Sequence, residues 1–160
     1  MKIDKLHSFR KFKIVAETIE KYAGNKIISP EEADNYLRPL FADQIDVVEM
    51  FFVVFLDNQK NVIGHYHVST GGRFATYVDT SIIYKTAVET LANSVILAHN
   101  HPTGTFKASA ADLKLTSKIA AGLKTLQIEI DDHLILMPDA KEKPHLSFRC
   151  QHNDALNGYL

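Results

Sequence analysis

Apolar residues recur along the chain with two periods, which distinguish the expected helices from the expected strands. Over 5–23 they are three and four residues apart, as on one face of a helix. Over 47–57 they are nearly consecutive and mostly β-branched or aromatic, which is typical of a buried strand. These patterns predict helices over 5–23, 29–39, 79–94 and 109–124 and strands over 47–57, 62–70, 95–100, 128–137 and 145–150.

Capping residues mark the start of the second expected helix. Ser29 is a favourable N-cap, Pro30 suits the first helical position, and Glu32 completes a capping box. Pro39 is expected to end or bend this helix, because proline lacks a backbone N–H.

The third expected helix begins at a cap formed by Asp79 or Thr80. Its inner face repeats at helical spacing. The residues predicted on that face are Ile83, Ala87, Val88 and Leu91.

The order of these elements predicts an α/β (α+β) fold with a mixed β-sheet flanked by helices. The strand over 95–100 is short and apolar, as expected for a central member of the sheet. Residues 1–45 are too few for a core of their own, so they form a helical lead-in to a domain over 46–150. The polar residues 151–160 are expected to form a frayed tail.

Composition narrows the class of protein. The 160 residues suit one compact domain. The net charge is −1, and the sequence contains no run of Lys and Arg of the kind that binds nucleic acid electrostatically. A single cysteine, Cys150, excludes an intrachain disulfide and a four-cysteine zinc site, and fits a reducing cytoplasm. We expect no signal peptide and no membrane span, since no apolar run approaches the roughly 20 residues that a span needs.

The candidate chemistry lies in the segment "ILAHNHPTGTFKASAADLKL". His99 and His101 are two residues apart where a strand ends, so their side chains project to the same side. Asp112, at the start of the next helix, could supply a third contact. Two neutral imidazoles and a carboxylate are a set that zinc accepts, with a fourth position left for water. The spacing alone leaves open that the histidines are ordinary polar residues and that Ser109 and Asp112 only cap the helix.

Glu49 is a second candidate. It is the one charge in a ten-residue apolar stretch, and a buried carboxylate is rare without a task or a partner. The alternative is that Glu49 lies at the start of the strand and reaches solvent. A second H-x-H, at His65 and His67, has no acid nearby and is not expected to bind metal.

The stretch "HNHPTGTFKASAAD" resembles the signature of JAMM (MPN-type) metalloproteases, H-x-H-P followed by S-x-x-D. The spelling "AHNHP-x-G" resembles the RadC-like branch of that superfamily more closely. The stretches "EMFFVVFLDNQKNVI" and "IEIDDHLIL" resemble further parts of the RadC-like pattern. The resemblance covers 47–148, and it implies a three-layer sandwich like that of the JAMM and cytidine deaminase folds.

The resemblance also implies roles for individual residues. It assigns His99, His101 and Asp112 as zinc ligands, Glu49 as the general acid/base, and Ser109 as the group that stabilises the oxyanion. N/O ligands around an open position favour zinc over other divalent metals. The matching "DH" at Asp132 and His133 is expected to support the site or the packing around it.

The chain departs from the family pattern in three places. "TFKA" stands where the family has a proline-rich link, "TSI" stands where it often has "REV", and we expect no N-terminal helix-hairpin-helix region. The first departure affects the rim of the site rather than its ligands. The last removes the part that most suggests contact with DNA.

These observations predict a zinc-dependent hydrolase that cleaves an amide or isopeptide bond in a peptide or protein. The alternative is an accessory protein of DNA repair or of a mobile element, although the near-neutral charge does not favour DNA binding. A pseudo-enzyme scaffold is a third alternative, which the complete set of site residues disfavours. Whether the chain forms a homodimer is open, and no membrane partner is expected.

Overall fold

The computed structural model describes residues 26–71, 77–138 and 145–158, so the helix predicted over 5–23 lies outside the described residues. Five strands form one mixed sheet in the order β2-β1-β3-β4-β5. The β3/β4 pair is parallel, and the other pairs are antiparallel. The strands are β1 (Met50–Leu56), β2 (Val62–Thr70), β3 (Ser94–Asn100), β4 (Glu129–Leu136) and β5 (His145–Ser147).

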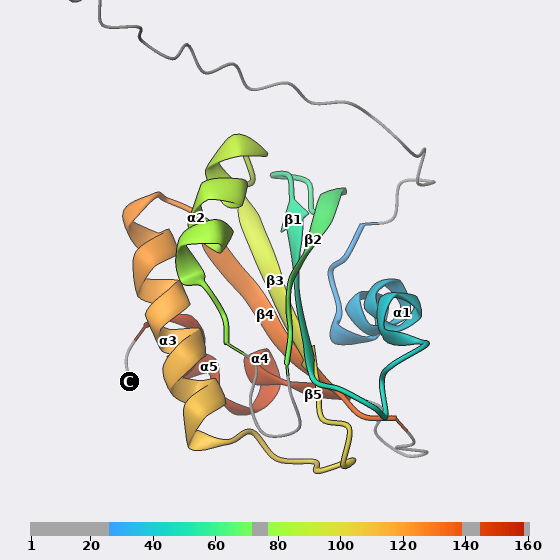
Figure 1. Ribbon diagram of the computed structural model, residues 1–160. Helices are drawn as coiled ribbons and strands as arrows, with labels where there is room; N and C mark the ends of the chain where they lie inside the picture. The colour runs from blue at the N-terminus through green and yellow to red at the C-terminus, as the bar shows by residue number, and fades with distance from the viewer. Residues whose placement is uncertain (1–25, 72–76, 139–144, 159–160) are drawn as a thin grey trace, which may run out of the picture.

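Helices cover both faces of this sheet, with α1 on one side and α2 and α3 on the other (Figure 1). The predicted three-layer arrangement is therefore confirmed. Within the described ranges, no helix is long and apolar enough to cross a bilayer. The helices are α1 (Pro30–Phe41), α2 (Thr80–Glu89), α3 (Ala110–Thr125), α4 (Phe148–Gln151) and α5 (Asn153–Leu156).

Helix α1 begins as predicted. The Ser29 hydroxyl accepts a hydrogen bond from the backbone N–H of Glu32, and the Glu32 carboxylate accepts one from the N–H of Ser29. Pro39 does not stop the helix, which continues to Phe41; a proline in the last turn costs only one helical hydrogen bond. Leu37 and Phe41 are fully buried against the sheet, which ties α1 to the core.

The predicted cap of helix α2 and part of its predicted inner face are confirmed. Asp79 is the N-cap, and Ile83 and Ala87 are buried. The expected burial of Val88 and Leu91 is wrong, because these side chains are 45% and 80% exposed. The helix ends at Glu89, and Leu91 then takes a left-handed conformation with φ 54°, which removes it from the helical face.

Two segment boundaries also differ from the predictions. Strand β1 begins at Met50 rather than at 47, since residues 42–47 form turns. The segment 145–150 pairs with β4 for only three residues before α4 begins.

The C-terminal residues are more ordered than predicted. The expectation of a frayed tail is wrong for α5, where Ala155 and Leu156 are buried beside Phe148. Two apolar side chains in a polar stretch are thus enough to dock this short helix.

Strand β3 is the central strand that the sequence predicts, buried along its whole length between β1 and β4. Its alternate residues face opposite layers: Ile96 and Ala98 pack in the core beneath α1, and Val95 and Leu97 pack in the core beneath α2 and α3. The alternation continues to His99, whose side chain therefore emerges on the α2/α3 side of the sheet.

Candidate metal centre

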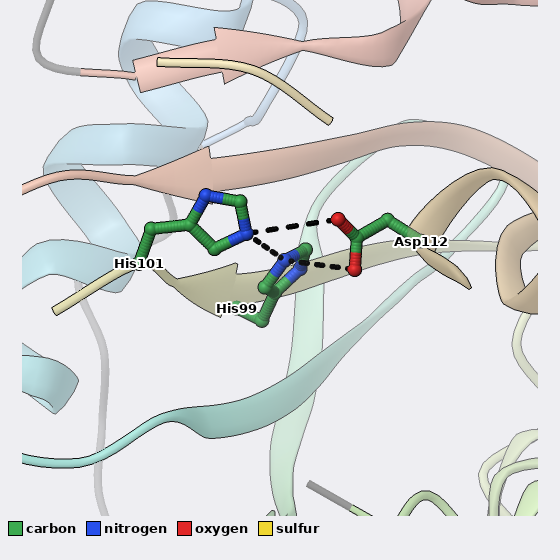
Figure 2. A group of neighbouring side chains, drawn as sticks. All are labelled: His99, His101 and Asp112. Carbon is green, nitrogen blue, oxygen red and sulfur yellow. Dashed lines mark hydrogen bonds and ion pairs between the residues drawn. The ribbon is translucent and has the colours of Figure 1, made fainter. Parts of the chain in front are cut away.

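Three side chains that are separate in the sequence converge at the end of β3 (Figure 2). The His99 Nε2 and His101 Nε2 atoms are 3.1 Å apart. The Asp112 carboxylate lies 3.4 Å from the first nitrogen and 3.6 Å from the second. Two ligands of a tetrahedral zinc ion, each about 2.0–2.1 Å from the metal, lie about 3.3 Å from one another. The three groups could therefore hold one metal ion.

A short turn after β3 carries His101 and leads to helix α3, which carries Asp112. The backbone N–H of His101 donates to the carbonyl of Leu136, which prolongs the β3/β4 pairing by one residue. The His101 carbonyl then accepts from the N–H of Gly104, whose φ of 73° favours glycine. The turn sends the chain back toward the sheet, where Ser109 caps α3.

Ser109 and Asp112 form a complete capping box. The Ser109 hydroxyl accepts from the Asp112 N–H at 3.1 Å, and the Asp112 carboxylate accepts from the Ser109 N–H at 2.7 Å. The same carboxylate faces both histidines (Figure 2). The sequence leaves open whether Asp112 caps the helix or binds a metal. In the structure the Asp112 side chain caps α3 and also faces the two histidines, so one role does not exclude the other.

The pKa values of His99 and Asp112 suit a cation, whereas the pKa of His101 is shifted in the opposite direction by the carboxylate beside it. Burial lowers the pKa of His99 to about 4, so its imidazole is neutral at pH 7. Burial also opposes the charge on His101, but its hydrogen bonds with Asp112 and the Thr105 carbonyl raise its pKa above the usual value. Burial raises the pKa of Asp112, yet His101 and His99 outweigh it and hold that pKa well below the ordinary range.

Glu49 shares a cavity wall with His99, His101, Ser109 and Asp112. It lies one residue before β1 and is half-buried, so it is neither inside the strand nor fully in solvent. Burial and the negative charge of Asp112 raise its pKa, with His101 acting in the opposite sense. A carboxyl group shifted toward neutrality is suited to proton transfer.

Asn100 is a buried residue that sequence reasoning passed over. Its side-chain oxygen accepts from the Met50 N–H at 2.7 Å, and its amide donates to the carbonyls of Ile45 and Val48 at 2.7 and 2.8 Å. These three bonds fix the segment that carries Glu49 beside the histidines. The available signal was a polar residue at the end of an otherwise apolar strand.

Asp132 and His133, which the sequence predicts to support the site, make contacts in two different parts of the structure. Asp132 accepts hydrogen bonds from the Ser147 hydroxyl at 2.6 Å and from the Arg149 N–H at 2.9 Å, which ties β4 to β5 and α4. Burial nevertheless leaves the pKa of Asp132 raised. His133 lies against the proposed ligands instead, with its Nε2 atom 2.8 Å from His99 Nδ1.

The second H-x-H motif lies on β2, outside the site. His65 Nδ1 is hydrogen-bonded to the Tyr36 hydroxyl at 2.8 Å, and His67 Nε2 to the Thr70 hydroxyl at 3.0 Å. Among the described residues, the group of three or more histidine, cysteine or acidic side chains that could hold a metal is His99, His101 and Asp112.

The sheet-and-helix sandwich and the His-His-Asp cluster define a JAB-type domain, the class to which JAMM proteins belong. A family model described as the RadC-like JAB domain matches residues 27–153. The chain therefore belongs to the RadC-like JAB domain family, which confirms the resemblance noted in the sequence.

Curated relatives support this membership. An UPF0758 protein of Flavobacterium johnsoniae is 37% identical over 111 residues, which are 69% of this chain and 48% of the relative. An UPF0758 protein of Aliivibrio fischeri is 32% identical over 134 residues, 80% of this chain and 59% of the relative. The chain thus spans about half the length of the relatives it matches. Their names state no reaction, so activity is argued from the site.

Proposed function

We propose that this chain is a zinc-dependent hydrolase that cleaves an amide bond in a peptide or protein. The observation that carries the proposal is the convergence of His99, His101 and Asp112 beside the carboxyl group of Glu49. The donors are two imidazole nitrogens and one carboxylate, which is the N/O set that zinc accepts in hydrolytic sites. When bound, zinc lowers the pKa of water and polarises a carbonyl group.

Glu49 is the general base in this proposal. It takes a proton from the attacking water as the water oxygen bonds to the amide carbon, and passes that proton to the nitrogen as the C–N bond breaks. The raised pKa of Glu49 supports this exchange, because it makes the carboxylate a stronger base than an ordinary glutamate.

Ser109 stabilises the oxyanion in this proposal. Its oxygen accepts from the Asp112 N–H, and its hydroxyl proton, which also stabilises the Asp112 carboxylate, would be donated to the negative charge that develops on the carbonyl oxygen. The helix cap therefore fixes the position of the Ser109 oxygen beside the candidate ligands.

Family membership and the side chains that line the cavity support the substrate class of this proposal. The cavity wall includes Phe51 and Tyr77, and Tyr77 is 84% exposed. These two aromatic side chains offer apolar surface on which a side chain of a peptide substrate could pack.

The test compares the wild-type chain with Glu49→Gln, using quenched fluorescent peptide libraries and isopeptide-linked peptides. Glu49→Gln is expected to keep its zinc and to lose about 10²- to 10⁴-fold in cleavage rate, the usual contribution of a general base. Glu129→Gln is the matched control, because this exposed residue lies at the opposite end of the sheet from the site.

Two results would overturn the proposal. One is a zinc-loaded wild-type chain that cleaves none of these substrates. The other is a Glu49→Gln variant that is as active as the wild type. Salt-dependent retention on DNA by an inactive wild-type chain would favour the accessory-protein alternative instead.

A further inference from the structure

A continuous chain of hydrogen bonds leaves His99 through the ring nitrogen that does not face Asp112. His99 Nδ1 lies 2.8 Å from His133 Nε2, and His133 Nδ1 lies 2.6 Å from the Thr116 hydroxyl. The Thr116 hydroxyl in turn donates to the backbone carbonyl of Asp112 at 2.7 Å. His99, His133 and Thr116 are all buried, so water does not compete for these bonds.

The direction of each bond follows from counting protons. A backbone carbonyl only accepts, so the single hydroxyl proton of Thr116 is donated to the carbonyl of Asp112. The Thr116 oxygen must then accept from His133, which places the ring proton of His133 on Nδ1.

The same count settles the proton on His99. A neutral imidazole has one ring proton, so His133 Nε2 is an acceptor and takes the Nδ1 proton of His99. The Nε2 atom of His99 is left with its lone pair exposed toward His101 and Asp112.

We propose that Thr116 and His133 are positioning residues that hold His99 in the tautomer able to bind a metal ion through Nε2. The opposite tautomer would place a proton on Nε2, between His99 and the carboxylate, and would block coordination. This inference rests on the metal site of the proposed function. To the proposed ligands it adds Thr116 on α3 and His133 on β4, which support His99 without binding the ion themselves.

His101 reaches the same state by a simpler route, because its Nδ1 lies 2.9 Å from the Thr105 carbonyl, which can only accept. In its neutral form, His101 therefore also carries its proton on Nδ1 and has Nε2 available to an ion. The fully buried His99 relies on a side-chain relay, since its Nδ1 atom faces His133 rather than a backbone carbonyl.

Aromatic rings pack against the His133 ring, and the chain of hydrogen bonds ends at Asp112, the residue that supplies the acid. The His133 ring is stacked on Phe148 with centroids 4.6 Å apart, and Phe51 meets it edge-on at 5.6 Å. Asp112 contributes its carboxylate to the site and its carbonyl to the end of the relay. The first turn of α3 therefore orients both the acid and a histidine on the neighbouring strand.

The first measurement is the ¹⁵N chemical shift of the His99 ring in the zinc-free wild-type chain. We expect the proton on Nδ1 and an unprotonated Nε2. A proton on Nε2 would overturn the proposal. This measurement needs no variant and no metal, so it remains decisive if the chain binds no zinc and the proposed function fails.

The second measurement uses Thr116→Val, which keeps the side-chain shape and removes the hydroxyl, with Thr116→Ser as the matched control. Zinc affinity, measured by competition with a chromogenic chelator, is expected to fall about 10- to 100-fold in Thr116→Val, as for other supporting partners of metal ligands. Thr116→Ser is expected to bind zinc nearly as tightly as the wild type and to keep the His99 proton on Nδ1. A folded Thr116→Val variant with wild-type zinc affinity would overturn the proposal, while zinc binding by the wild type would remain established.

Discussion

Asp112 shows how one side chain can belong to a helix cap and to a candidate metal site. Its carboxylate accepts from the Ser109 N–H and also faces both imidazoles. In the sequence the same four letters support either interpretation. Only the turn before α3, which returns the carboxylate to the end of β3, makes the two compatible.

Variants of Asp112 should separate these two roles. Asp112→Asn keeps an oxygen that can accept from the Ser109 N–H, whereas Asp112→Ala removes the acceptor. Both should lose zinc, but only Asp112→Ala should also lose about 1 kcal/mol of unfolding free energy from the helix start. Elemental analysis and urea denaturation of the zinc-free proteins measure the two effects. Stoichiometric zinc in Asp112→Ala would show that this residue is not a ligand.

Asn100 offers a test of how Glu49 is held. Asn100→Ala leaves the buried Met50 N–H and two carbonyls without their partner, which should cost about 1–3 kcal/mol of unfolding free energy. Because the freed segment carries Glu49 and not the metal ligands, peptide cleavage should fall more than zinc affinity. Asn58→Ala, in the exposed hairpin turn, is the control. Equal losses of cleavage and zinc affinity would contradict this division.

At the scale of elements, local signals located most of the helices and strands. The capping box of α1 was explicit in the sequence, and β2 has the predicted bounds because the turn over 57–60 precedes it and Gly71 follows it. The start of β1 was misplaced because residues 47 and 48 are apolar although they lie in a turn and a bend. The contact between His133 and Thr116 was beyond prediction, since it depends on how β4 and α3 pack.

The attachment of α1 to the sheet should depend on pH through Asp34. The Arg38 guanidinium binds both Asp34, at 2.8 Å, and the Met137 carbonyl, at 3.0 Å. Burial raises the pKa of Asp34, but His145 and Arg38 together hold it below its usual value. A depressed carboxyl pKa contributes stability that is present above the unfolded-state pKa and is lost as pH falls through the folded-state pKa.

Asp34→Asn should therefore lower the unfolding free energy by about 1–3 kcal/mol at pH 7. The difference from the wild type should shrink as pH falls below the ordinary aspartate pKa of about 4. Urea denaturation at several pH values measures this, with the exposed Asp43→Asn as the control. A difference that stays constant down to pH 3 would show that the charge of Asp34 is not responsible.

At the scale of the whole molecule, the candidate site joins elements from most of the fold. The proposed ligands come from β3, the turn after it and α3, while Glu49 precedes β1 and His133 lies on β4. The family resemblance allowed the ligand set to be predicted from the sequence. It did not specify the supports, because Asn100 and Thr116 act through contacts with segments 17 to 55 residues away.

A ligand that joins several elements should stabilise the fold as a whole. Zinc at about 1,000 times its dissociation constant should raise the unfolding free energy by about 4 kcal/mol, provided that the unfolded chain does not bind it. Urea denaturation with and without zinc measures the change, and Asp112→Asn should show none. An equal gain in that variant would place the zinc elsewhere.

X-ray absorption at the zinc edge examines the coordination of the bound ion itself. For the chain loaded with one equivalent of zinc, we predict nitrogen and oxygen neighbours at about 2.0–2.1 Å, with outer-shell scattering from two imidazole rings. Sulfur at about 2.3 Å, which the exposed Cys150 would supply, or a single imidazole ring, would contradict the assignment of His99, His101 and Asp112 as the ligands.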